Sequence, residues 1–427
     1  MSIHIDHFET LESYMEALGA AARKSANTLR LTTTEQRNSA LKFMAQDIRS
    51  AQDSIIAANK QDMKAGTAKG LSPAMLDRLA LDNSRLESVA AGLEAIAALP
   101  DPVNAVDESW QRPNGLEFAK VRVPIGVIGM IYESRPNVTA DAGALCLKSG
   151  NSCILRGGSE ASNSNLAIHS AMASGLTRAG LDPNCIQYIG TMDRAAVGQL
   201  LGGLNGSVDL IIPRGGKNLI ARVQTDARVP VLAHLEGLNH SYVHEGADLD
   251  KAVELILNAK LRRTGVCGST ETVLIDRAIA DSAAPRIISS LVDKDCEIRG
   301  DADICSYSDA VTKASAEDFK TEHLAAILNM RIVDNIGEAL AHIESHGSGH
   351  TDCIITEDHQ AAEQFLRDVD SAICMHNAST QFADGGEFGF GAEIGIATGR
   401  LHARGPVGAQ HLTTYKYRVI GNGHTRP

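Results

Sequence analysis

The residue best placed for chemistry in this chain is Cys267. It lies in the glycine-flanked segment 262–272, Arg-Arg-Thr-Gly-Val-Cys-Gly-Ser-Thr-Glu-Thr, between helically spaced apolar residues at 250–261 and an apolar run at 272–275. A thiol on a tight turn just after several cations is placed where its thiolate is stabilised. Those cations are Lys260, Arg262 and Arg263. Because the thiolate is the nucleophilic form, the segment indicates covalent catalysis; the alternative is a small buried cysteine that fills a gap.

The segments around Cys267 predict how it is positioned. The first hundred residues show the apolar spacing of helices, and from about residue 116 short β-rich runs alternate with helical stretches. The predicted strands are 127–131, 153–156, 186–189, 209–212 and 273–275. The predicted helices after residue 116 include 140–148, 165–178 and 250–261. This alternation predicts an α/β protein with largely parallel sheets.

Length and composition restrict the class of protein. A chain of 427 residues, 44% hydrophobic and 22% charged, is typical of a globular protein of two or three domains. The net charge of −12 and the lack of a long basic stretch argue against nucleic-acid binding. The N-terminus does not resemble a signal peptide, and no apolar run approaches the roughly 18 residues of a membrane span. We therefore expect a cytoplasmic protein with no membrane contact.

Cysteine, histidine and glycine patterns narrow the chemistry further. The eight cysteines are scattered without a CxxC pair, which fits a reducing compartment. Fifteen histidines form no HExxH and no Cys/His ligand cluster, so we expect no catalytic metal. No GxGxxG follows a predicted strand. Gly215-Gly216 does follow the predicted strand 209–212, so its amides could face an anion at a helix start, although an ordinary turn would look the same.

Four further segments occur in the same order as in one known family. They are Val123–Thr139, Leu147–Asn151, Ile212–Gly216 and Asn377–Gly423. Together with Cys267 they resemble the γ-glutamyl phosphate reductases, also called glutamate-5-semialdehyde dehydrogenases, of the aldehyde dehydrogenase superfamily. The resemblance covers most of the chain. It implies an oxidoreductase that uses NADPH to reduce γ-glutamyl phosphate to glutamate 5-semialdehyde and phosphate, the second step of proline synthesis from glutamate.

The resemblance also implies an architecture: an aldehyde-dehydrogenase-like α/β fold with two parallel-sheet domains, for cofactor and catalysis, plus a β oligomerisation arm. The expected NADPH-binding domain is 1–111 with 129–235. The expected catalytic domain is 236–409, and the arm and C-terminal segment are 112–128 and 410–427. The implied partners are further copies of the chain, in a dimer or tetramer, and a transient association with glutamate kinase that would protect the labile acyl phosphate.

Roles for single residues follow from the same resemblance. Cys267 matches the nucleophile, and Asn137 matches the asparagine whose side-chain amide forms an oxyanion hole with the Cys267 backbone amide. Cofactor contacts are expected at Arg156, Gly215, Gly216 and Glu322. A cation at Arg156 suits a 2′-phosphate. Substrate contacts are expected at Arg135, Arg263 and Arg404, since arginine binds phosphate or carboxylate through paired hydrogen bonds; which of them binds which group stays open.

The chain departs from related enzymes at two places. Many reductases of this family carry Asn-Ala after the nucleophile, where this chain has Gly268-Ser269. His234 stands where ordinary aldehyde dehydrogenases have a general-base glutamate, and Glu236 is close but out of register. An aldehyde-oxidising enzyme needs that carboxylate to activate water, whereas a reductase of an acyl phosphate must keep water from its thioester. The loss of the base therefore fits a reductase.

Three other functions remain to be separated from this one. A reductase of an acyl-coenzyme A would use the same thioester chemistry but would ignore phosphate. A cysteine acyltransferase or hydrolase without nicotinamide would need a base paired with Cys267 and would not bind NADPH. A catalytically inactive oligomeric binding protein of the same fold would show no activity in an assay.

Overall fold

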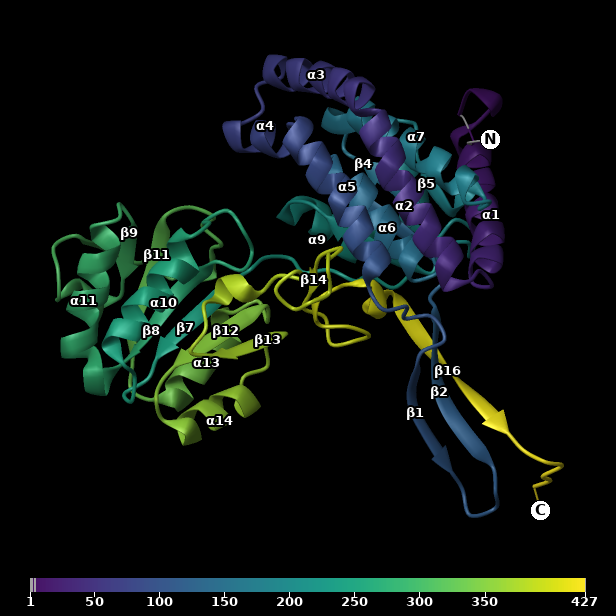
Figure 1. The fold of residues 1–427 in the computed structure, drawn as a ribbon. Coiled ribbons are helices and arrows are strands. Elements are labelled where there is room, and N and C mark those ends of the chain that lie inside the picture. Colours follow the sequence, from purple (N-terminus) through teal and green to yellow (C-terminus); the bar gives the residue numbers. More distant parts are fainter. Residues whose placement is uncertain (1–2, 4, 427) are drawn as a thin grey trace. The chain divides into compact units, whose positions relative to one another are not determined.

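The computed structural model describes residue 3 and residues 5–426 and divides the chain into two compact units. Unit 1 comprises residues 1–233, 389–395 and 407–427, and unit 2 comprises 234–388 and 396–406. Each unit contains its own parallel sheet, and Figure 1 labels their elements. This confirms the predicted α/β class. No helix in the described residues is long and apolar enough to span a membrane.

The body of unit 1 is a four-stranded parallel sheet in the order β5-β4-β3-β6. Its strands are β3 (Val127–Tyr132), β4 (Ser152–Gly157), β5 (Ile186–Tyr188) and β6 (Leu210–Arg214). Its α-helices are α1 (Leu11–Leu29), α2 (Thr34–Ser50), α3 (Gln52–Ala68), α4 (Pro73–Leu79), α5 (Asn83–Ala98), α6 (Asn137–Lys148), α7 (Ser162–Arg178), α8 (Ala195–Leu201) and α9 (Lys217–Asp226). Its 3₁₀ turns are Ile5–His7, Ser159–Ala161, Pro183–Cys185 and Ala409–Leu412. The predicted strands and helices of this region are confirmed, with ends shifted by one to three residues.

Helices cover the sheet of unit 1 in layers. On one face, Leu18 of α1 and Leu200 of α8 pack against Ile131, Ile154 and Ile211 of the strands. Helices α6 and α7 contact β4 and β5, and α2 and α5 pack outside them (Figure 1). The helical pattern of the first hundred residues therefore forms an added helical layer.

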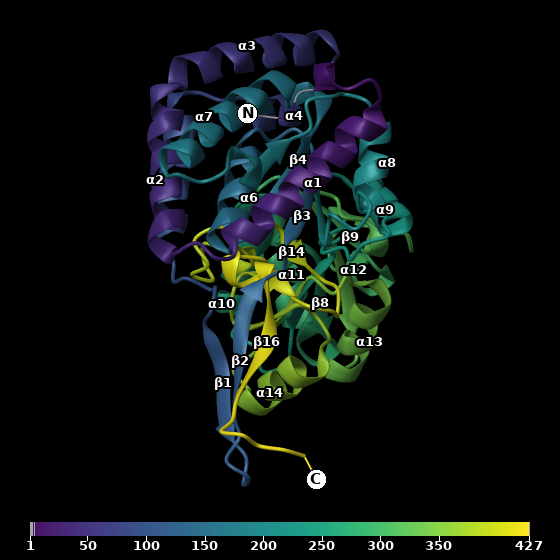
Figure 2. The same ribbon diagram turned by 90° about the vertical axis from the view of Figure 1, so that its right-hand side faces the viewer.

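A separate antiparallel sheet in unit 1 has the order β1-β2-β16 (Figure 2). Its strands are β1 (Val106–Gln111), β2 (Glu117–Pro124) and β16 (Thr413–Ile420). The sheet thus begins before the predicted arm segment 112–128, because the hairpin pairs Trp110 with Phe118, whose rings stack with centroids 5.4 Å apart.

Unit 2 contains a seven-stranded sheet, parallel throughout, in the order β10-β9-β11-β8-β7-β12-β13. Its strands are β7 (Asn239–Val243), β8 (Thr270–Asp276), β9 (Glu297–Gly300), β10 (Val311–Lys313), β11 (Ile327–Val333), β12 (Thr351–Ile355) and β13 (Ile373–His376). A small antiparallel pair is formed by β14 (Ile396–Ala397) and β15 (Gly405–Pro406). The α-helices are α10 (Leu249–Leu261), α11 (Ala280–Val292), α12 (Ala302–Cys305), α13 (Ile336–His346) and α14 (His359–Asp368). The 3₁₀ turns are Arg277–Ile279, Asp318–Lys320 and Thr380–Phe382.

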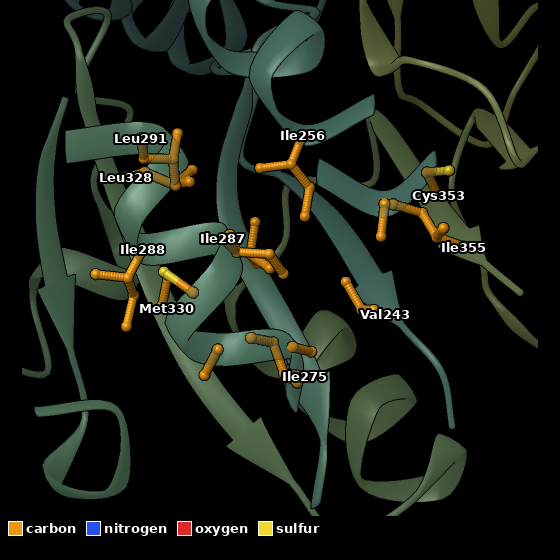
Figure 3. Packing of buried hydrophobic residues seen from close by; sticks show 14 of the residues in the cluster. Val243, Ile256, Ile275, Ile287, Ile288, Leu291, Leu328, Met330, Cys353 and Ile355 are labelled. Carbon is orange, nitrogen blue, oxygen red and sulfur yellow. The ribbon is translucent and has the colours of Figure 1, made fainter. Parts of the chain in front are cut away.

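The core of unit 2 fixes the central strands that carry the site. Figure 3 shows Ile256 of α10 and Ile287 of α11 beside Val243, Ile275 and other buried side chains of the strands. Helices α13 and α14 supply a second cluster around Phe365. Each fully buried side chain of this size contributes about 1.5–3 kcal/mol. Strands β7, β8 and β12 are therefore held rigidly from both faces.

The unit boundaries differ from the predicted catalytic domain 236–409, because residues 389–395 and 407–409 belong to unit 1. Local contacts explain this. Glu393 forms an ion pair with Arg214 at 3.6 Å, and Gly391 lies against the side chain of Leu99. The amide of Ile394 donates to the Val407 carbonyl at 2.9 Å, which brings the two short segments together.

Candidate active site

Cys267 lies in unit 2, in the turn that leads from α10 into the amino end of β8. Helix α10 begins after Asp248, whose side chain accepts a hydrogen bond from the Lys251 amide. The turn closes where the Ser269 amide donates to the Val266 carbonyl at 3.0 Å. The Cys267 side chain is half-buried, so a reactant has partial access to it.

A buried side chain that the sequence did not single out, Asn239, holds this turn. Its Nδ2 donates to the carbonyl oxygens of Cys267 at 2.6 Å and of Ser269 at 2.9 Å. Its Oδ1 accepts from the Thr351 amide at 3.2 Å. Asn239 therefore ties together the amino ends of β7, β8 and β12. Asn239 lies in the segment Leu238–Val243, which also contains the polar residues His240 and Ser241, so the sequence offered no clear signal for its role.

Two histidines lie next to the thiol. The Sγ of Cys267 and one ring nitrogen each of His234 and His350 all lie within 4.8 Å of one another. The two imidazole rings meet edge to face, with centroids 5.2 Å apart. The sequence pointed to His234 but not to His350, which belongs to a distant stretch of chain and arrives here because β12 pairs with β7.

The tautomer of His234 follows from its neighbour. Nδ1 lies 2.6 Å from the carbonyl oxygen of Ile396, which can only accept a hydrogen bond. In the neutral ring Nδ1 therefore carries the hydrogen, and Nε2 keeps the lone pair. Nδ1 of His350, a fully buried residue, lies 2.8 Å from Thr351 Oγ1. An imidazole nitrogen that carries a lone pair beside a thiol can take the thiol proton and leave the nucleophilic thiolate.

Close backbone packing brings Glu322 to the same turn. The amide of Gly237 donates to Glu322 Oε1 at 2.9 Å. A Cβ on Gly237 would stand 2.0 Å from the Cys267 carbonyl oxygen, so only glycine fits there. The structure thus places Glu322 next to the backbone that supports the thiol, while its expected contact with a cofactor ribose stays a prediction.

A buried ion pair braces the two sides of the turn. Lys260 Nζ lies 2.7 Å from Glu271 Oε2, and both side chains are almost fully buried. Burial raises the pKa of Glu271 to about 7, although the Lys260 ammonium acts in the opposite direction. The Lys260 ammonium is therefore held by Glu271 and is not freely available to the Cys267 thiolate.

The residues that follow Cys267 are small because the turn is crowded. A Cβ on Gly268 would lie 3.1 Å from the Thr380 carbonyl oxygen. The buried Ser269 donates through Oγ to the Lys260 carbonyl at 3.3 Å. In this chain Gly268-Ser269 therefore serves to pack the turn.

The two candidate substrate arginines of unit 2 differ in their surroundings. The side chain of Arg263 is exposed, while its backbone carbonyl accepts from Gln381 Nε2 at 3.0 Å. Arg404 Nη1 donates to Asp370 Oδ1 at 2.8 Å, so its charge is already paired with a carboxylate. Their contacts with substrate remain predictions.

In unit 1 the candidate residues lie at the carboxyl ends of parallel strands. Arg156, at the end of β4, is buried, and its guanidinium donates to the carbonyls of Gly157 and Met192. Its Nε has no hydrogen-bond partner among the described residues. An arginine held in this way, with a donor to spare, fits an anionic group of a bound nucleotide.

The neighbouring strands of unit 1 carry Asn137 and the glycine pair. Asn137 opens α6 and donates through Nδ2 to Asp141 Oδ2 at 2.9 Å, which leaves a second amide hydrogen. Arg135 is half-buried just before it. The Gly216 amide donates to Glu133 Oε2 at 2.9 Å, so the anion that it faces here belongs to the protein itself.

Known proteins are similar to this chain in sequence over nearly its whole length. The model of the aldehyde dehydrogenase family matches residues 8–294. The γ-glutamyl phosphate reductase of Caulobacter vibrioides is 61% identical over 97% of this chain and all of its own. That of Rhodopseudomonas palustris (strain HaA2) is 57% identical over 99% of this chain and 98% of its own.

Solved structures agree with these sequences. The crystal structure of γ-glutamyl phosphate reductase from Thermotoga maritima is 42% identical, with a TM-score of 0.95, over 97% of this chain and all of that one. An acetylating aldehyde dehydrogenase from Geobacillus thermoglucosidasius is 17% identical over 98% of this chain and all of that one, and its TM-score of 0.69 shows a shared fold. The resemblance seen in the sequence is thereby confirmed. The chain belongs to the aldehyde dehydrogenase family and, within it, to the γ-glutamyl phosphate reductases, and it is an oxidoreductase.

Proposed function

We propose that this enzyme uses NADPH to reduce γ-glutamyl phosphate to glutamate 5-semialdehyde and inorganic phosphate, the second step of proline synthesis from glutamate. The observation that carries the proposal is Cys267, held by Asn239 next to the imidazole of His234, in a chain whose relatives over its full length bear the name of this reductase.

The acyl-transfer step follows from the chemistry of these side chains. His234 takes the thiol proton at Nε2, and the Cys267 thiolate attacks the γ-acyl carbon. The bond from that carbon to the phosphate oxygen breaks, so that phosphate leaves and a thioester forms on Cys267. NADPH, when bound, supplies the hydride that turns the thioester into a thiohemiacetal. The thiohemiacetal then collapses, which frees the thiolate and the semialdehyde.

Two donors would stabilise the oxyanions on this path. One is the backbone amide of Cys267, and the resemblance assigns the other to the Asn137 side chain; each is worth about 3 kcal/mol in comparable sites. After proton transfer His234 is an imidazolium, which cannot act as a base toward water. The thioester therefore meets no activated water from this residue.

Binding of the cofactor is assigned to Arg156, Gly215, Gly216 and Glu322. The guanidinium of Arg156 suits the 2′-phosphate that distinguishes NADPH from NADH. The Gly216 amide would have to exchange Glu133 for a cofactor group.

Substrate binding is assigned to Arg135, Arg263 and Arg404. Arg404 would have to exchange Asp370 for the substrate.

The proposal extends to assembly and location. The β1-β2-β16 sheet exposes apolar and aromatic side chains, among them Tyr417, Val419 and Ile420. This is a surface that suits pairing with another copy of the chain in a cytoplasmic dimer or tetramer. Transient association with glutamate kinase would shorten the exposure of the acyl phosphate to water.

The reverse reaction tests the proposal. Purified enzyme is mixed with glutamate 5-semialdehyde and NADP⁺, with phosphate or with coenzyme A, and reduced cofactor is followed by absorbance. Oxidation that requires phosphate and produces γ-glutamyl phosphate supports the proposal. Oxidation that requires coenzyme A and ignores phosphate contradicts it and favours an acyl-coenzyme A reductase.

A further inference from the structure

The thiol of Cys267 and the imidazoles of His234 and His350 form a set of possible metal ligands that the reductase reaction does not fully explain. Proton transfer from Cys267 needs one base, yet a ring nitrogen of His234 and one of His350 both lie within 4.8 Å of Sγ and of each other. One sulfur and two nitrogens are ligands that Zn²⁺ prefers.

The hydrogen bonds at Nδ1 of His234 and His350 resemble those of metal-binding histidines. A metal-bound imidazole usually donates its other N–H to a carbonyl, carboxylate or water, which fixes the ring and its tautomer. His234 donates Nδ1–H to the Ile396 carbonyl, and His350 Nδ1 lies 2.8 Å from Thr351 Oγ1. With Nδ1–H donated in this way, His234 presents Nε2 as its ligand atom, and His350 and Cys267 each offer one ligand atom to the same cluster. Zinc bonds of about 2.0–2.3 Å would draw the three atoms together by a small movement of the side chains.

We propose that Cys267, His234 and His350 form a reversible Zn²⁺ site that inhibits the enzyme. The Cys267 thiol releases its proton to solvent as the sulfur–zinc bond forms, and a water molecule completes the coordination at the fourth position. The metal then occupies the lone pair with which the sulfur would attack the acyl carbon. Binding of the metal does not depend on the proposed substrate, whereas inhibition rests on the proposed function of Cys267.

Cobalt reports on the site without any assay of activity. Co²⁺, a spectroscopic substitute for zinc, is titrated into the full-length protein, and the near-ultraviolet sulfur-to-cobalt absorption band is recorded; Zn²⁺ then competes for it. We expect one ion per chain. We also expect loss of the band in Cys267→Ser and an affinity lowered about 10-fold or more in His234→Ala, which removes one of three ligands. His350→Ala should lower the affinity similarly. Because His350 is buried, that variant could fail to fold, and the result for His234→Ala then decides whether the site exists.

Matched controls lie elsewhere in unit 2. His359 is an exposed histidine and Cys305 a half-exposed cysteine outside the cluster, so His359→Ala and Cys305→Ala should bind Co²⁺ like the unchanged protein. No binding at one ion per chain, a band that persists in Cys267→Ser, or equal affinity in His234→Ala overturns the site.

Inhibition is tested separately. Zn²⁺ should block alkylation of Cys267 by iodoacetamide and stop turnover, and a chelator should restore both. Turnover that continues with the metal bound overturns the inhibition. A protein that binds the metal and is protected from alkylation, but never reduces γ-glutamyl phosphate, contradicts the proposed function and leaves the metal site standing.

Discussion

The two units use opposite edges of their parallel sheets. In unit 1 the candidate residues follow the carboxyl ends of β3, β4 and β6, where ligands of open α/β sheets usually bind. In unit 2 the candidate residues lie at the amino ends of β7, β8 and β12. Unit 1 presents the starts of α6 and α9 and the guanidinium of Arg156, which are groups that bind anions. Unit 2 presents a thiol, an amide and two imidazoles that neighbouring strands hold in fixed positions.

Under the proposed roles, this difference separates the cofactor contact of Arg156 from the chemistry of Cys267. The groups at the carboxyl edge of unit 1 lie at the end of β4, at the start of α6 and in the turn after β6, and Glu133 already accepts from the Gly216 amide. The groups at the amino edge of unit 2 are tied to one another by Asn239. Changes at Arg156 of unit 1 should therefore act on affinity for cofactor, and changes at Cys267 and Asn239 of unit 2 should act on turnover.

The largest effect is expected from Cys267→Ser. Loss of the nucleophile should lower kcat by about 10⁴-fold or more, while NADPH should bind with unchanged Kd because its assigned contacts lie mainly in unit 1. Activity assays and NADPH fluorescence titration measure the two quantities. Turnover close to that of the unchanged enzyme would refute the assignment of the nucleophile.

A carboxylate in place of His234 should change the product. In His234→Glu, a base that does not become cationic stands near the thioester and should speed its hydrolysis by about 10²-fold. Glutamate would then form from γ-glutamyl phosphate and is measured by chromatography. A folded variant that releases no additional glutamate would show that position 234 does not face the acyl group.

Asn239→Leu tests whether the amino edge sets the geometry of the thiol. The loss of two hydrogen bonds to the turn should displace Cys267 and lower kcat by about 10²-fold, with a loss of about 1–3 kcal/mol in the free energy of unfolding. Asn59 of unit 1 is a matched control, since it is also buried and its side chain also donates to a backbone carbonyl. If Asn59→Leu lowers kcat equally, the effect is one of general stability.

Arg156→Ala probes the carboxyl edge of unit 1. Removal of a charged hydrogen bond worth about 1.5–3 kcal/mol should raise the KM for NADPH roughly 10–100-fold, with little change for NADH. Steady-state kinetics with both cofactors measure the ratio, and Arg156→Lys should keep part of the preference. Equal effects on the two cofactors would remove the role in 2′-phosphate binding.

The smallest effect on the rate is expected at the buried pair Lys260–Glu271, where the predicted change is in the free energy of unfolding. Because the pKa of Glu271 is raised to about 7, the folded protein keeps a proton between about pH 4.5 and pH 7 that the unfolded chain releases. The free energy of unfolding of the unchanged protein, taken relative to that of Glu271→Gln, should therefore fall by up to about 3 kcal/mol as the pH rises from about 4.5 to about 7. Above about pH 7 this difference should not change further. Denaturant unfolding at several pH values tests this. A constant difference between the two proteins would contradict it.

The sequence predicted what depends on local pattern. Strands near 127–131 and 273–275 follow from runs of apolar residues, and the Cys267 turn follows from its glycines and flanking elements. It could not predict that His350 meets Cys267, because the neighbourhood of β8, β7 and β12 is set by packing between distant segments. For the same reason the support from Asn239 and the transfer of residues 389–395 to unit 1 became visible only in the fold.

The most direct test of the account is the fate of the sulfur of Cys267 during one turnover. Enzyme mixed with γ-glutamyl phosphate in the absence of NADPH is quenched in acid within milliseconds to seconds, digested and analysed by mass spectrometry. We predict a glutamyl group on the peptide that contains Cys267, and its disappearance when NADPH is added before the quench. Product formation without that adduct, or an adduct on a different residue, would contradict it.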